Sequence, residues 1–515
     1  MKLIFTLFLL IGSLSSFSQT SYFSVNETGR LDKIVKVSAG GYITSGYDSN
    51  YKHQYIRWDE NFNPLWKIKL MDAGFAPFSN YVIEANDGSF FISAMSNNNS
   101  GSFFVMKLSS TGTVMWQKFY SAPGTGNSLS SLCLSKAAGS DNGFIFGTGN
   151  CTLSNCIVKC DAAGNIEWQK QYIYPLAAGV ITCWTILPDG NNYIVCSGFN
   201  IKSLLTYKLD AMGAVISYNA NTYTWTPQIL PTKLVKLNVT GGYALLGQYN
   251  NSNNNKTQFV AFYNSALSLL SFNELTVTYD QFTLTDIAAV NNGQDVIVNG
   301  NMYDNSKFYC AIMQLSNTGN IGWKHLSDGN TTTSIKNVQF DGIVAKGNST
   351  VNVGAGFYEG AIVGIIDSTG NGLCNTLPFN VTNVPKTLTL ESSVLSSFNG
   401  NAIASVATTV YTNIVSFSKK MYCGSLPNSI IEQNELENAI SFYPNPADDM
   451  LQLKLNHALN GKTTVKILSL DGRVLYQHAL SSDLRINTSG FATGFYIVSI
   501  SDEKFVTNEK IEIAH

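Results

Sequence analysis

Charged residues and histidines are scarce in this chain of 515 residues. Asp, Glu, Lys and Arg together make up 13% of it, and the formal net charge is −2. A protein that binds nucleic acid needs a basic surface to meet the phosphates, so this composition argues against a nucleic-acid partner. The familiar linear motifs of hydrolases, metalloproteases, phosphate-binding loops and dinucleotide-binding folds are also missing. The sequence therefore assigns no catalytic residue, no cofactor and no metal site.

Long apolar runs are missing too. No segment reaches the roughly 18 uninterrupted apolar residues that a membrane helix needs, so we expect no transmembrane segment. Residues 1–18 place Lys2 before a short apolar run and end in small residues. That is the pattern of a secretory signal peptide, and the mature chain should begin near Gln19.

Cysteines are present in an odd number, nine, in a chain that we expect to leave the reducing cytosol. At least one of them must stay a thiol or pair outside the chain. Cys151, Cys156 and Cys160 lie close together, but no fourth ligand of matching spacing accompanies them. A local disulfide or buried thiols are therefore favoured over a metal site. The candidate disulfide cysteines are Cys151, Cys156, Cys374 and Cys423.

A glycine-led strand recurs at intervals of about fifty residues, the spacing of a four-stranded β-propeller blade. A β-branched run precedes each copy and further runs follow it, which gives four strands per unit. The sequence predicts an all-β fold: a propeller over residues 19–425, of eight four-stranded blades or, as the alternative, seven. The eight copies begin at Gly40, Asp87, Asp141, Asp189, Gly241, Asn292, Lys346 and Asn399.

The eighth copy is incomplete. Its strands are expected at 392–398, 401–408 and 412–418, without a full fourth strand. The segment YFSVNE at 22–27 stands before the first copy and can supply the missing strand. Such an exchange would close the ring and leave no exposed edge. Cys374 and Cys423 occupy corresponding places in neighbouring copies, and a disulfide between them would span the closure.

A tryptophan marks one place in the fourth strand of several copies, which predicts packing between neighbouring sheets and not a binding cleft. These residues are Trp66, Trp116, Trp168 and Trp323.

A short turn such as DAAG at 161–164 precedes that fourth strand. Asp161 can cap the turn through a side-chain oxygen, and Gly164 accepts a positive φ. Ser109 and Ser316 stand at the same place in other copies. A metal site or a catalytic acid would not accept this exchange, so we interpret the repeated Asp as a turn residue.

The pattern changes after a polar linker at 426–439. Residues 440–515 alternate around Pro-Asn-Pro, Asp-Gly and Gly turns, which predicts a small C-terminal β-sandwich. Its motifs are YPNPA (443–447), LDGR (470–473), GFYIVSI (494–500) and NEKIEI (508–513). Together they resemble the type A C-terminal sorting domain of the type IX secretion system of Bacteroidetes. A carbohydrate-binding sandwich shares the strand pattern, but the terminal position and the YPNPA opening argue against it.

The resemblance implies a partner and a destination. Such domains engage the type IX secretion machinery and carry cargo from the periplasm through the outer membrane, where the cargo is released or anchored to surface lipopolysaccharide. The repeats also look like those of exported Bacteroidetes propeller proteins. The residues that carry the resemblance of the sorting domain are Tyr443, Pro444, Asn445, Pro446, Asp471, Gly472, Gly494, Tyr496 and Lys510.

Two hypotheses about function follow. The first is a non-enzymatic propeller that presents a loop-built face to a glycan or protein ligand at the cell surface. The second is a surface polysaccharide hydrolase or lyase with its site in the central funnel. Two carboxylates and an Arg or His converging near the axis would favour the enzyme.

Overall fold

The computed structural model divides the chain into two compact units, Met1–Pro427 and Asn428–His515. It describes residues 21–25, 29–48, 50–70, 81–95, 103–121, 130–151, 154–173, 182–198, 203–222, 229–250, 256–277, 281–304, 307–327, 338–356, 360–372, 376–377, 381–391, 396–399, 403–406, 411–413, 419–424, 440–455, 463–469, 473–480, 482–501 and 506–515. Among these residues, no helix has the length and apolar character needed to cross a membrane.

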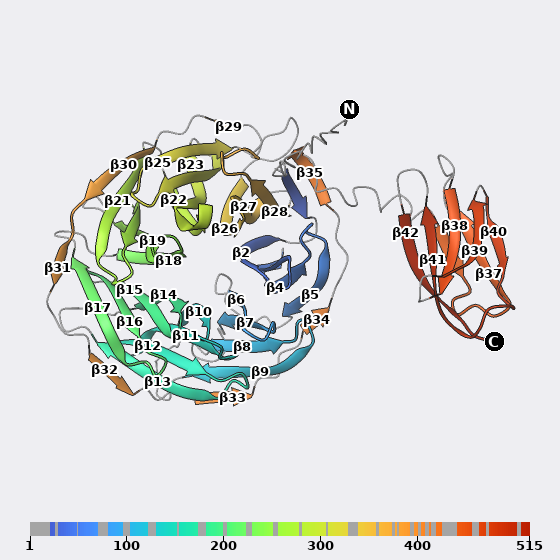
Figure 1. Cartoon of the computed structure of the whole chain (residues 1–515), viewed down its shortest axis with the longest axis horizontal. Coiled ribbons are helices and arrows are strands. Elements are labelled where there is room, and N and C mark those ends of the chain that lie inside the picture. The colour runs from blue at the N-terminus through green and yellow to red at the C-terminus, as the bar shows by residue number, and fades with distance from the viewer. Residues whose placement is uncertain are drawn as a thin grey trace, which may run out of the picture. The chain divides into compact units, whose positions relative to one another are not determined.

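Seven antiparallel sheets of five strands each form a β-propeller in the first unit (Figure 1). Four strands of each sheet form a blade. Blade 1 holds β2 (Arg30–Lys36), β3 (Tyr42–Tyr47), β4 (His53–Trp58) and β5 (Pro64–Leu70); blade 2 holds β6 (Tyr81–Glu84), β7 (Phe90–Met95), β8 (Phe103–Leu108) and β9 (Val114–Ser121); blade 3 holds β10 (Ser130–Lys136), β11 (Phe144–Cys151), β12 (Ser154–Cys160) and β13 (Ile166–Ile173).

The remaining blades follow the same order. Blade 4 holds β14 (Thr182–Asp189), β15 (Asn192–Gly198), β16 (Ser203–Leu209) and β17 (Val215–Thr222); blade 5 holds β18 (Ile229–Leu237), β19 (Gly242–Asn250), β20 (Lys256–Tyr263) and β21 (Leu269–Val277); blade 6 holds β22 (Gln281–Val290), the short helix η1 (Asn291–Gly293), β23 (Asp295–Asp304), β24 (Lys307–Ser316) and β25 (Ile321–Ser327). The glycine-led runs of the first six copies are the second strands of these six blades, as predicted.

Blade 7 joins the two ends of the ring. It consists of β26 (Val338–Lys346), β27 (Ser349–Gly356), β28 (Gly360–Ile366) and, as its fourth strand, β1 (Ser21–Val25). The register pairs Phe23 with Val363. The predicted closure by the N-terminal strand is therefore confirmed, although it completes the seventh blade and not an eighth. The seven-bladed alternative is the one that the structure adopts.

Residues 376–424 form what we call the belt, a segment that runs back around the ring and adds a fifth, outer strand to every blade (Figure 1). It starts on blade 6, passes blades 5, 4, 3, 2 and 1 in turn, and ends on blade 7. Its strands are β29 (Thr376–Leu377), β30 (Val381–Lys386), β31 (Thr389–Glu391), β32 (Ser396–Asn399), β33 (Ile403–Val406), β34 (Tyr411–Asn413) and β35 (Lys419–Gly424).

The belt corrects the prediction of an eighth blade. The runs expected at 392–398, 401–408 and 412–418 contain strand segments, but β32, β33 and β34 pair with blades 3, 2 and 1 and not with one another. The physical reason is that the fourth strand of every blade leaves an outer edge of unpaired backbone groups, and a short strand can satisfy any such edge. With the belt in place, each of these edges is paired.

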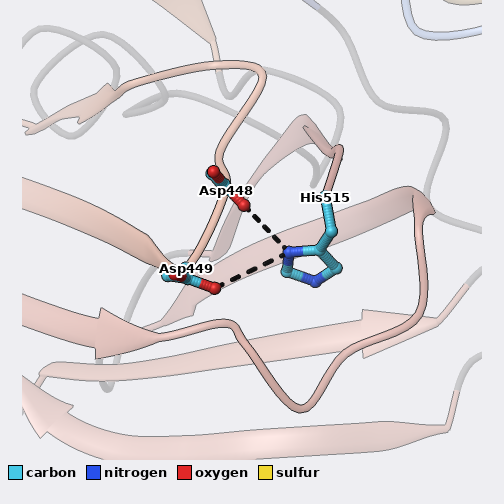
Figure 2. Close-up of side chains that lie close together, drawn as sticks. All are labelled: Asp448, Asp449 and His515. Carbon is cyan, nitrogen blue, oxygen red and sulfur yellow. Dashed lines mark hydrogen bonds and ion pairs between the residues drawn. The ribbon is translucent and has the colours of Figure 1, made fainter.

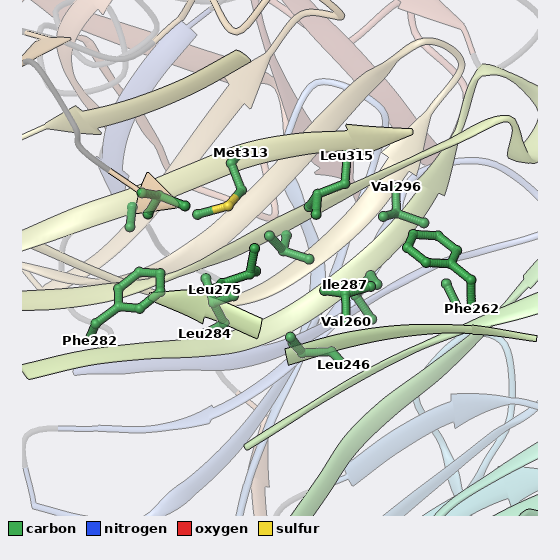
Figure 3. Close-up of a cluster of buried hydrophobic side chains, with 14 of the residues drawn as sticks. Leu246, Val260, Phe262, Leu275, Phe282, Leu284, Ile287, Val296, Met313 and Leu315 are labelled. Atoms are coloured by element: carbon green, nitrogen blue, oxygen red, sulfur yellow. The ribbon is translucent and has the colours of Figure 1, made fainter. Parts of the chain in front are cut away.

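The hydrophobic core lies between the blades, because each blade is covered on both faces by its neighbours. Figure 3 shows one such cluster at the junction of blades 5 and 6. Leu246, Val260 and Phe262 from blade 5 meet Ile287 and Met313 from blade 6, and all of them are buried. Burying one large apolar side chain contributes roughly 1.5–3 kcal/mol, so these junctions are what hold the ring together.

The second unit contains two antiparallel sheets with a shared core. One sheet has the order β36 (Ile440–Tyr443), β37 (Met450–Leu455), β40 (Leu484–Asn487), and the other has the order β39 (Val474–Leu480), β38 (Thr463–Ser469), β41 (Gly494–Ser501), β42 (Val506–Ile513). Leu451 and Leu453 of the first sheet lie in one cluster with Val465 and Val498 of the second. This arrangement agrees with the small two-sheet module expected from the sequence.

Candidate functional site

The carboxylate of Asp161 is occupied by its own turn. Its Oδ1 accepts hydrogen bonds from the backbone N–H groups of Ala163 (2.9 Å) and Asn165 (2.8 Å), and its Oδ2 accepts one from the Asn165 amide (3.0 Å). Partial burial raises the pKa of Asp161, but the hydrogen bonds from Asn165 and Ala163 lower it by more, so the pKa lies below its usual value. Gly164 has φ 75°. The prediction that Asp161 supports a turn is confirmed.

The same turn recurs with other first residues. The Ser109 hydroxyl accepts from the Thr113 N–H, and the Ser316 hydroxyl accepts from the Asn320 N–H. Blade 5 has an equivalent turn that we did not predict, in which the Asn264 side chain accepts from the N–H groups two and four residues later. Leu267, with φ 65°, stands there in place of glycine. The Asn at the first place was the signal that could have revealed it.

Each tryptophan of the repeat closes the junction to the next blade. The indole N–H donates to a backbone carbonyl in the turn of the following blade, at distances of 2.7–3.1 Å. A Cβ placed on Gly213 would lie 2.8 Å from the Trp168 ring, so the turn glycine permits the close approach. The predicted packing between sheets is confirmed. The four pairs are Trp66 with Ser110, Trp116 with Ala162, Trp168 with Ala211, and Trp323 with Ser368.

A buried tyrosine four residues after the tryptophan completes two of these junctions. The hydroxyl of Tyr120 donates to the Gly164 carbonyl, and that of Tyr172 donates to the Gly213 carbonyl, both at 2.8 Å. Tyr172 is fully buried. We call the tryptophan and tyrosine together the aromatic latch. It fills the outer part of the junction between two blades.

The aromatic latch is missing between blades 4 and 5. Ser217 pairs with Lys208 as Trp168 pairs with Lys159 one blade earlier, so serine stands in the tryptophan position. Asn221 then occupies the tyrosine position. The amide of Asn219 donates to the Leu267 carbonyl (2.8 Å) and replaces the tyrosine hydroxyl at that acceptor. This hydrogen bond still joins the two blades, but no aromatic side chain fills the space between them.

A cavity of about 320 Å³, which we call the rim pocket, opens in this place. Its walls come from β17, from the start of β21 and from the belt between β30 and β31. Among the described residues, the buried Oδ1 of Asn221 has no hydrogen-bond partner. The residues that line it include Asn219, Asn221, Leu270, Phe272, Lys386 and Leu388.

A second polar group, the seam cluster, joins the innermost strands of blades 1 and 7. Arg30 binds two carboxylates, with its Nε 2.7 Å from Asp32 and its Nη2 2.5 Å from Asp341. Burial raises the pKa of Asp341 to about 7, with Asp32 adding to the rise and Arg30 and Lys33 opposing it. Sequence reasoning missed this cluster because Arg30 and Asp341 are 311 positions apart.

In the second unit, the YPNPA segment is bound to the last strand. Asn445 accepts a hydrogen bond from the Glu512 N–H through its side chain (2.8 Å). The Ala447 N–H donates to the Glu512 carbonyl (2.7 Å), and the Ala514 N–H donates to the Ala447 carbonyl (2.8 Å). The structure thus bonds Asn445 and Ala447 to the end of β42, while Tyr443 pairs with Gln452 of β37 and Pro444 and Pro446 lie in the same segment. Residues 445–447 and 512–514 form what we call the clasp.

Asp448, Asp449 and His515 lie close together next to this clasp, as Figure 2 shows. No sequence motif marks these three residues. The Nδ1 of His515 lies 3.1 Å from Asp448 and 3.9 Å from Asp449, while its Nε2 lies 3.0 Å from the Phe491 carbonyl. The hydrogen bond to Asp448 raises the pKa of His515. A ring that donates from both nitrogens is the charged form, whereas a metal ligand must be neutral, so the geometry is that of an ion pair.

The other residues of the sorting motif are placed in part. Gly494 starts β41, and the hydroxyl of Tyr496 donates to the Ala492 carbonyl at 2.6 Å. The backbone of Lys510 pairs with Ile497 in β42, but its side chain lies outside the described residues. Asp471 and Gly472 also lie outside them.

The candidate disulfides are also placed only in part. Cys156 is disulfide-bonded, while the side chain of Cys151 is outside the described residues. Cys374 and the side chain of Cys423 are outside them as well. The pairing of these four cysteines therefore stays a prediction. Cys160, in contrast, is a buried thiol.

Comparison with known proteins identifies the second unit. Residues 441–514 match the family described as "Secretion system C-terminal sorting domain". The chain carries a secretion sorting domain. This domain indicates export by type IX secretion, interaction with that machinery, and a secreted or outer-membrane surface-attached protein. No curated protein matches the chain.

Several solved structures resemble the chain at low identity. Raptor from Chaetomium thermophilum is 10% identical with a TM-score of 0.42, and the match covers 70% of this chain and 30% of Raptor. The BP39L lectin from Burkholderia pseudomallei is 14% identical with a TM-score of 0.39, covering 69% and 98%. The NanB sialidase from Streptococcus pneumoniae is 11% identical with a TM-score of 0.35, covering 71% and 70%. Likenesses this weak carry no argument about ligand or activity.

Proposed function

We propose that the chain is a non-enzymatic binding protein of the Bacteroidetes, built on a propeller and delivered by type IX secretion to the outer cell surface or the medium. The observation that carries the export part of this proposal is the sorting domain at residues 441–514. The signal-peptide pattern at 1–18 supplies the first export step, into the periplasm. The sorting domain then supplies the second step, across the outer membrane.

The division of the chain supports a separable address. The belt ends at β35, after every outer edge of the propeller has been paired, and the clasp of the second unit is made within residues 440–515. Each unit has its own hydrophobic clusters. The propeller is therefore the cargo, and its folding does not depend on strands from the sorting domain.

Deleting residues 440–515 tests the proposal in a bacterium with type IX secretion. We expect the truncated protein to accumulate in the periplasm, while the full chain reaches the cell surface or the medium. Resistance of the truncated chain to protease and an unchanged far-UV spectrum would show that the propeller still folds. Efficient release of the truncated chain would contradict the proposal.

The seam cluster favours a second candidate, a surface polysaccharide hydrolase or lyase. It brings two carboxylates and an arginine together on the innermost strands, as such an enzyme requires. However, both carboxylates bind the same guanidinium, and the Asp341 side chain is only 8% exposed. A structural ion pair explains this geometry equally well, and we rank the enzyme second.

Product release from polysaccharides distinguishes the two candidates. An enzyme would produce new reducing ends or unsaturated sugars, and Asp341→Asn would abolish that activity in a variant that still folds. A binding protein would show no product with either chain. Activity that survives Asp341→Asn would remove the seam cluster as its source.

A further inference from the structure

The rim pocket is a consequence of two exchanges at one junction of the ring. Where blades 3 and 4 meet, Trp168 and Tyr172 occupy the space beside the next turn. Where blades 4 and 5 meet, Ser217 and Asn221 stand at these positions, and both are much smaller. Leu267 packs into the cluster between the two blades and fills only part of the gap. The remaining volume, about 320 Å³, lies within the range of small-molecule sites.

Asn221 lines this volume and carries an unsatisfied acceptor. The residue is 5% exposed, and among the described residues its Oδ1 has no hydrogen-bond partner. Buried polar atoms in native proteins are almost always satisfied, and an exception is expected to have a reason. An amide oxygen only accepts hydrogen bonds, so the missing partner must be a donor. A hydroxyl group from a ligand supplies one when the amide turns into the cavity, because the Oδ1 itself has almost no accessible surface in this structure.

The rest of the lining suits a neutral ligand. Among the described lining residues, Lys386 alone is charged, and its Nζ lies 3.6 Å from the Glu274 carboxylate, which offsets its charge. Ser268, Ser271 and Thr387 add hydroxyl groups to the wall. Leu270 is 64% exposed beside them, an apolar surface on which the C–H face of a sugar ring can pack.

We propose that the rim pocket binds a neutral sugar residue, with the Oδ1 of Asn221 accepting a hydrogen bond from one of its hydroxyl groups. This inference deepens the proposed binding function by naming a site and a ligand class. The pocket is assembled from three segments that are distant in sequence, namely β17, the start of β21 and the belt. It therefore exists only in the complete ring, after the belt has added its outer strands.

Titration of the purified full chain with monosaccharides tests the proposal. Glucose, galactose, mannose and N-acetylglucosamine serve as neutral probes, with glucuronate and galacturonate as acidic ones, and saturation-transfer NMR and calorimetry detect weak binding. We expect at least one neutral sugar to bind. Asn221→Leu, which keeps the size but removes the acceptor, should weaken it about tenfold. Asn221→Tyr, which restores the residue of blades 2 and 3, should abolish it.

A matched control lies one junction away. Tyr172→Phe removes a hydroxyl at the position equivalent to Asn221 and should leave sugar binding unchanged. The inference is overturned if no neutral sugar binds, if only the uronates bind, or if Asn221→Tyr binds as the parent chain does while melting at a similar temperature. Because the titration uses purified protein, it is independent of export. A failure here leaves the export proposal standing, and a failure of export leaves the pocket standing.

Discussion

The junctions on either side of blade 4 share one backbone design but differ in what they can do. Between blades 3 and 4, Trp168 and Tyr172 fill the space and bond to the next turn. Between blades 4 and 5, Asn219 keeps one of these hydrogen bonds, while Asn221 leaves a polar cavity. A repeat fold can therefore create a binding site by losing two side chains at one junction, because the other junctions and the belt keep the ring closed.

The largest expected effect comes from forcing a side chain into the filled junction. Gly213→Val places a Cβ 2.8 Å from Trp168 at φ 73°, and we expect a loss of roughly 4 kcal/mol in the free energy of unfolding, from backbone strain and overpacking together. Gly190→Val is the matched control, because its φ is 62° but its surroundings are open. It should lose only about 2 kcal/mol in the same denaturant titration. Equal losses would show that the latch does not crowd this turn.

Removing the latch should have the next largest effect. Trp168→Ala deletes an aromatic ring and its hydrogen bond to Ala211, and we expect the free energy of unfolding to fall by roughly 3 kcal/mol. Ser217→Ala changes the same position in the open junction and should stay within about 0.5 kcal/mol. Chemical denaturation of both variants measures the difference. Similar values for the two would mean that the junctions are not held in different ways.

Rebuilding half of the latch should stabilise the open junction. Asn221→Tyr fills the cavity and places a hydroxyl near the Leu267 carbonyl, so we expect a gain of about 1 kcal/mol. The reverse exchange, Tyr172→Asn, should destabilise the filled junction by roughly 2 kcal/mol. Thermal melts of the two variants should move in opposite directions. A lower melting temperature for Asn221→Tyr would show that the cavity is not the counterpart of the tyrosine site.

The smallest effect is expected at the turn itself. Asp161→Ser should cost about 1 kcal/mol or less near neutral pH, because Ser109 and Ser316 already cap equivalent turns through a hydroxyl. The pKa of Asp161 is lowered in the folded state, so its stabilising effect is present above the unfolded pKa and disappears as the pH falls through the folded value. Melts of both chains should therefore converge in acid, and calcium or a chelator should shift neither. A calcium-dependent melting point that Asp161→Ser abolishes would make the turn a metal site.

Much of the fold could be predicted because its signals are local and repeated. The glycine-led strands, the turn at Asp161 and the place of Trp168 all follow from side chains within one repeat. The belt could not be predicted, because its short strands pair through backbone atoms with the outer strands of the blades. Backbone pairing of this kind leaves no recognisable side-chain pattern in the sequence. The seam cluster could not be predicted either, because Arg30 and Asp341 meet only when the first and last blades come together in the ring.

The rim pocket is an intermediate case. Aligning the repeats shows that the fourth and fifth copies have Ser217 and Ser271 where the copies of blades 1, 2, 3 and 6 have tryptophan. That absence was the available signal. The alignment could not reveal the third wall of the rim pocket, because this wall comes from Lys386 and Leu388 of the belt. The position of the site was therefore readable in part, while its shape and its buried acceptor were not.

A crystal structure of the full chain soaked in a neutral sugar that binds in solution tests the central claim most directly. It should show one sugar in the pocket between blades 4 and 5, with a hydroxyl group within hydrogen-bonding distance of the Asn221 Oδ1, and none at the filled junction between blades 3 and 4. A sugar bound elsewhere on the ring, with the Asn221 Oδ1 bonded only to protein or water, would contradict it.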